Sequence, residues 1–61
     1  MNRTRIIDSL CAMFNAHNNS TTPTWLMELH TSSSNEVLAQ RMANWRENYP
    51  EEYAQHGIYV L

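Results

Sequence analysis

The strongest helical pattern of the chain lies in residues 34–50, which read SNEVLAQRMANWRENYP. At about 100° of rotation per residue, four large side chains fall within about 60° on one face of such a helix. They form a seam, defined here as Leu38, Met42, Trp45 and Tyr49. Pro50 disfavours helical geometry at the residue before it, so the helix is predicted to span residues 34–48. A seam of this size predicts packing against an apolar partner surface.

Polar residues before this stretch give two signals for helix starts. Ser33 and Glu36 have the spacing of a capping box, in which each side chain satisfies a free amide of the first helical turn. Thr22 followed by Pro23 predicts an N-cap and a first helical residue, because proline lacks only an N–H that is unpaired there. The second signal predicts a short helix over residues 23–30.

A first amphipathic helix is predicted over residues 4–17. Its apolar side chains cover about 160° of the helix surface; they are Ile6, Ile7, Leu10, Cys11, Met13 and Phe14. Cys11 is therefore expected to be a small core residue. In the short helix that follows, Trp25, Leu26 and Leu29 share one face, and Trp25 is expected inside the core.

These elements predict an all-α fold class and a single domain over residues 1–61. The architecture expected is three short helices, a C-terminal turn that begins at Pro50, and an extended apolar tail over residues 58–61. A domain this small gains stability from disulfides, a structural metal or self-association. Because Cys11 is the single cysteine, an internal disulfide is excluded, and a homodimer is expected.

Charge and hydropathy argue against a nucleic-acid partner, without excluding one, and against a membrane partner. The formal net charge is −2 and the chain has four basic residues, all arginine, so few cations are available to neutralise phosphates. No apolar run approaches the roughly 20 residues that a membrane-spanning helix needs. The N-terminal sequence also lacks the pattern of a secretory signal peptide. A cytoplasmic protein is expected, without a membrane partner.

No residue pattern predicts catalysis, a metal or another cofactor. His17, His30 and His56 each stand alone, whereas metal sites use ligands paired at short fixed spacings. A Cys–His nucleophile is excluded within the first helix, because Cys11 and His17 lie about 240° apart around it. The protein is therefore expected not to be an enzyme.

The function predicted is protein binding through an aromatic helical patch. Trp and Tyr are favoured at interfaces because they add buried area at low entropy cost and keep a polar edge. The contact residues predicted are Trp45, Tyr49, Tyr53 and Tyr59. The same side chains also fit a monomer core, and the sequence leaves open whether the seam is core or interface.

A dimeric helix-turn-helix DNA-binding transcriptional regulator is the alternative. The helices predicted over residues 23–30 and 34–48 have suitable lengths for it. The DNA-contacting residues would be Gln40, Arg41 and Asn44, because glutamine and asparagine can read adenine edges in the major groove. Glu36 and Glu47 share that face and would repel phosphates.

In overall character the chain resembles the small early-region proteins of lambda-like phages, such as those encoded between the exonuclease and excisionase genes. The likeness consists of a short, acidic, helical chain that begins MNRTR at residues 1–5 and is rich in Asn, Ser and Trp. It implies an adaptor or inhibitor that binds a host protein in the host cytoplasm. No functional residue is transferred by it.

Overall fold

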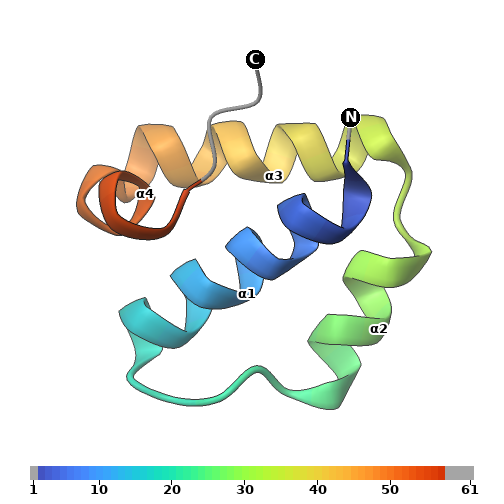
Figure 1. Ribbon diagram of the computed structural model, residues 1–61, viewed down its shortest axis with the longest axis horizontal. Coiled ribbons are helices and arrows are strands. Elements are labelled where there is room, and N and C mark those ends of the chain that lie inside the picture. The colour runs from blue at the N-terminus through green and yellow to red at the C-terminus, as the bar shows by residue number, and fades with distance from the viewer. Residues whose placement is uncertain (1, 58–61) are drawn as a thin grey trace.

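The computed structural model describes residues 2–57, which form four helices joined by short turns (Figure 1). The helices are α1 (Arg3–Asn18), α2 (Thr24–Ser32), α3 (Asn35–Asn48) and α4 (Pro50–His56). No strand occurs in this part of the chain, so the all-α prediction is confirmed. The extended tail that the sequence predicts lies outside the described residues.

The predicted C-terminal turn is instead a fourth helix, which corrects the expected number of three. Pro50 ends α3 and also begins α4, because proline is well suited to the first position of a helix. Glu51 and Glu52 occupy the first turn of α4, where the helix dipole favours negative charge. Gly57 follows the helix, and a Cβ atom there would lie 2.5 Å from the Tyr53 carbonyl oxygen.

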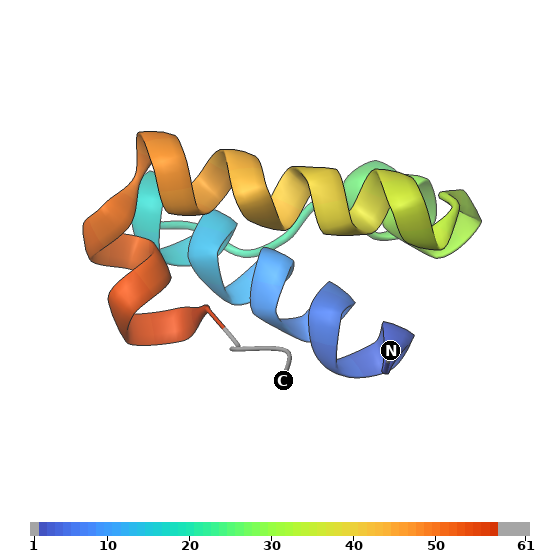
Figure 2. The same cartoon turned by 90° about the horizontal axis from the view of Figure 1, so that it is seen from above.

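The core lies between α1 and α3, and α4 covers one end of it (Figure 2). Its buried members are Ile6, Leu10, Met13, Leu38 and Met42, with Ile7, Trp45 and Tyr53 packed against them. Cys11 is also buried, as predicted. Two seam residues, Leu38 and Met42, therefore pack against α1 within the same chain. This contact explains the heavy apolar face of the third helix.

Two helix starts differ from the sequence prediction. The N-cap of α3 is Ser34, whose hydroxyl oxygen accepts a hydrogen bond from the Val37 amide at 3.2 Å. Ser33 is not the cap, since its hydroxyl donates to the Leu29 carbonyl oxygen at the end of α2. The run of consecutive serines offers several capping groups, and the turn geometry selects the last one.

Helix α2 also begins one residue later than predicted. Pro23 occupies its N-cap with extended backbone, and no side chain caps the helix there. The Thr22 hydroxyl instead donates to the Asn15 side-chain oxygen at 2.7 Å, which ties the connecting segment to α1. A tertiary hydrogen bond has therefore replaced the local cap.

Helices α2 and α4 lie at opposite ends of the α1–α3 pair (Figure 1). Among the residues of α2, His30 is the one that is fully buried. Helix α2 thus contributes a single buried side chain to the fold. Over residues 2–57, no helix has the length and apolar character needed to cross a membrane.

Candidate interaction surfaces

A pair of arginines holds the C-terminal end of α2. From α1, the Arg3 guanidinium donates to the carbonyl oxygens of Thr31 at 3.0 Å and Ser33 at 2.9 Å. It also donates to the Asn35 side chain at the start of α3. These carbonyl groups end α2, where positive charge is favoured by the helix dipole. Arg3 thus joins three helices at one turn.

The second arginine approaches the same turn from α3. Arg41 Nη1 lies 2.8 Å from the Ser33 hydroxyl oxygen and 3.0 Å from His30 Nδ1. The Ser33 hydroxyl in turn donates to the Leu29 carbonyl oxygen at 2.6 Å. Arg3, His30, Ser33 and Arg41 are called the α2 clamp below. Its contacts are polar, whereas the α1–α3 contact is mainly apolar.

The opposite side of α2 is an exposed apolar face. Trp25 is 64% exposed and Leu29 is 43% exposed. They are four residues apart, so they are neighbours on the helix surface, and the exposed residues Glu28 and Ser32 have the spacing that continues the same face. We define the outer α2 face as Trp25, Glu28, Leu29 and Ser32. It combines two large apolar side chains with one carboxylate.

The exposure of Trp25 shows that the prediction of a core position was wrong. The buried residue of α2 is His30, and Leu26, four residues before it, is half-buried. Trp25 and Leu29 lie about 100° or more around the helix from His30, which turns them away from the core. A pattern of apolar residues alone misses this orientation, because the decisive buried residue is polar.

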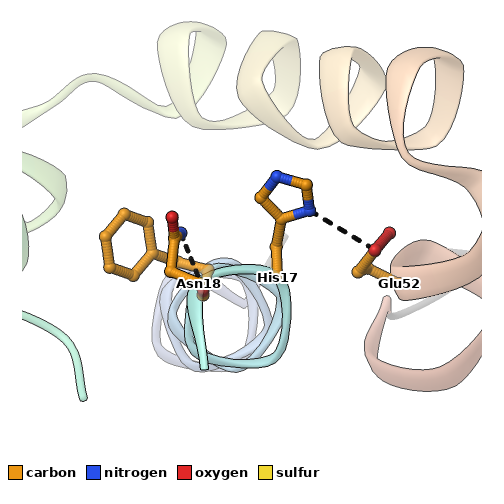
Figure 3. Close-up of polar contacts among 4 residues, drawn as sticks. His17, Asn18 and Glu52 are labelled. Atoms are coloured by element: carbon orange, nitrogen blue, oxygen red, sulfur yellow. Dashed lines mark hydrogen bonds and ion pairs between the residues drawn. The ribbon is translucent and has the colours of Figure 1, made fainter. Parts of the chain in front are cut away.

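An aromatic cluster lies at the other end of the molecule. The His17 ring, in the last turn of α1, is 4.4 Å from the Tyr49 ring and 5.9 Å from the Trp45 ring, measured between centroids. The Trp45 and Tyr49 rings are 4.7 Å apart. His17 Nδ1 also points toward Glu52 Oε1 of α4 at 3.4 Å (Figure 3). The cluster thus links α1 to α3 and α4.

Most of the predicted aromatic patch contributes to this packing. Trp45 and Tyr53 are half-buried and pack against the core. Tyr49 is 38% exposed, although its ring already contacts His17 and Trp45. Tyr59 lies outside the described residues. Binding of a partner by these four side chains stays a prediction.

The three residues of the DNA-binding alternative lie in different environments on α3. Gln40 and Asn44 are exposed on α3, and the exposed carboxylates of Glu36 and Glu47 share that surface. Arg41 is half-buried and engaged in the α2 clamp. The Arg41 guanidinium, which the DNA-binding alternative places at a phosphate, is therefore engaged in contacts within the protein.

Nothing in residues 2–57 forms a group of three or more His, Cys, Asp or Glu side chains that could hold a metal ion. A shallow groove of about 300 Å³ lies between α1 and α2. It is lined by Arg3, Thr4, Ile7, Asp8, Met27 and Thr31. The groove is open to solvent and borders α2, so it extends the surface available to a macromolecular partner.

Comparisons with models of protein families, with curated proteins and with solved structures found no match to this chain.

Proposed function

We propose that the protein is a small, non-enzymatic interaction module that binds another protein through the outer α2 face. The observation that carries this proposal is the exposure of Trp25 together with its neighbour Leu29 on a nine-residue helix. Tryptophan is enriched among the residues that dominate binding energies at protein interfaces. A short helix with apolar side chains at positions i and i+4 also suits an apolar groove.

The charge of the outer α2 face suggests the character of the groove on the partner protein. Glu28 is exposed on the outer α2 face, between the apolar side chains in sequence. Two of the four arginines, Arg3 and Arg41, are engaged in the α2 clamp and do not offset this charge at the outer face. We propose that the partner has an apolar groove bordered by Lys or Arg, because complementary charges favour correct docking.

A second copy of the chain fits this face less well. Antiparallel pairing of two α2 helices through Trp25 and Leu29 would bring both Glu28 carboxylates close to the two-fold axis. Like charges in such a position destabilise the pair. The homodimer predicted from chain length would need a different face or an additional cation.

The proposal is tested by capture of proteins from a lysate of the cells in which the chain naturally occurs. Trp25→Ala should weaken binding of the captured protein about 30-fold, which corresponds to roughly 2 kcal/mol for an interface tryptophan. Glu28→Lys should also weaken it, and added salt should weaken the wild-type complex. Circular dichroism checks that each variant remains folded.

Tyr49→Ala is the matched control, because Tyr49 is an exposed aromatic residue at the other end of the molecule. It should retain the captured protein. Loss of binding with Tyr49→Ala but not with Trp25→Ala would instead support the aromatic patch predicted from sequence. Salt-sensitive binding of duplex DNA that requires Gln40 and Asn44 would support the helix-turn-helix regulator.

A further inference from the structure

One buried histidine connects α2 to α3. His30 is 5% exposed and is the buried residue of α2, whereas the other side chains of this helix are exposed or half-buried. Its ring atom Nδ1 is 3.0 Å from Arg41 Nη1. The buried contact between α2 and α3 is therefore made by a titratable group.

The arginine fixes the state of the ring. A guanidinium group can only donate hydrogen bonds, so Nδ1 of His30 must accept and its proton must reside on Nε2. A second proton on Nδ1 would direct an N–H donor against the Arg41 donor. It would also place two positive charges at hydrogen-bond distance inside a half-buried site.

The charges around His30 also oppose protonation of its ring. Arg41 contacts the ring from α3, and Arg3 from α1 holds carbonyl groups of the turn that follows it. Across residues 2–57, no carboxylate forms a hydrogen bond or ion pair with His30. Burial lowers the pKa of His30 below its usual 6.5, and the charge of Arg41 lowers it further.

We infer that the α2 clamp is a pH-sensitive latch: protonation of His30 breaks the Arg41 contact and releases the C-terminal end of α2 from α3. The apolar contact of α1 with α3 and α4 does not include His30 and stays closed. The latch goes beyond the proposed function, although it would regulate it, because the outer α2 face lies on the helix that is released.

Amide hydrogen exchange of the free protein, measured by NMR at neutral and mildly acidic pH, tests the latch without any partner. Rates are expressed as protection relative to the unfolded chain, which removes the intrinsic effect of pH. Protection of α2 amides should fall on acidification by up to about tenfold for each unit by which the pKa of His30 is lowered. Protection in α1 and α3 should fall less.

Two variants and one direct observation separate the possible results. His30→Gln keeps a side chain that can accept from Arg41 but cannot titrate, so its α2 protection should not change with pH. His17→Gln should retain the wild-type response. NMR titration of the His30 ring in the wild-type protein should show protonation over the pH range in which α2 opens.

Any one of the following results would overturn the inference. The first is α2 protection that does not respond to pH in the wild-type protein. The second is an unchanged response in His30→Gln, or opening of α2 at a pH where the His30 ring remains neutral. The third is an equal loss of protection in α1, α2 and α3, which would mean global unfolding. None of these results bears on whether the outer α2 face binds a protein.

Discussion

The two tryptophans of the protein occupy opposite environments. Trp45 packs against the core and contacts the rings of His17 and Tyr49. Trp25 is mostly exposed on α2. Because the structural contribution of a side chain scales with the contacts it buries, the two residues should differ strongly in their effect on stability.

Alanine substitution measures that difference. Trp45→Ala should lower the free energy of unfolding by about 2–3 kcal/mol, somewhat less than the loss of a fully buried tryptophan. Trp25→Ala should change it by less than about 0.5 kcal/mol, as is usual for exposed positions. Urea unfolding followed by circular dichroism provides both values. Equal losses for the two variants would contradict the assigned environments.

The pKa of His30 has a consequence for stability as well as for the position of α2. The folded protein holds His30 unprotonated, whereas the unfolded chain takes up a proton as the pH falls below about 6.5. The contribution of His30 to stability should therefore be constant above this pH and decrease below it. Urea unfolding of the wild type and of His30→Gln across this pH range tests this direction. A smaller acid-induced loss of unfolding free energy in the wild type than in the variant would show that His30 has the opposite effect.

At the level of the helices, sequence periodicity predicted where α1, α2 and α3 lie but not every end or face. Leu38 and Met42 recur at helical spacing, so their burial followed from the pattern. The position of Trp25 could not be predicted this way, because the burial of His30 depends on Arg41 eleven residues later in the chain. The sequence predicts only a turn where α4 lies, because Pro50 is compatible both with the end of one helix and with the start of the next.

The cap of α3 gives a test at this level. Ser34→Ala should destabilise the protein by about 1 kcal/mol, because it leaves the Val37 amide without its side-chain acceptor. Ser32→Ala is the matched control, since its exposed hydroxyl bonds only a carbonyl of its own helix; it should change stability by less than about 0.5 kcal/mol. Thermal unfolding compares the two. A larger effect of Ser32→Ala would mean that the cap is misassigned.

Substitution of Arg3 tests how the C-terminal end of α2 is held against α1. Arg3→Ala removes donors to two carbonyl oxygens at the end of α2 and to Asn35. We expect a loss of about 1–2 kcal/mol, in the lower part of the range for hydrogen bonds to charged groups because the site is partly exposed. Amide exchange should locate most of the change in α2. Arg5→Ala, an exposed residue of the same helix, should leave α2 unchanged.

The whole molecule combines a closed core with an exposed helix. A single chain encloses Ile6, Leu10, Met13, Leu38 and Met42 between α1 and α3, with α4 at one end. The sequence predicts the apolar seam of α3. It does not determine whether the seam packs against α1 or against a second chain. The environments of the two tryptophans could not be predicted, because the burial of Trp45 and the exposure of Trp25 both depend on how the helices are arranged.

Photo-crosslinking inside the cells in which the chain naturally occurs tests the role of the outer α2 face most directly. A photoreactive benzoylphenylalanine at Ser32, which is exposed on that face, is compared with the same group at the exposed residue Gln40 of α3. We expect a covalent product with one different protein from position 32, which is lost when Trp25→Ala is added, and no product from position 40. A product with the mass of two copies of this chain, or one formed only from position 40, would contradict this expectation.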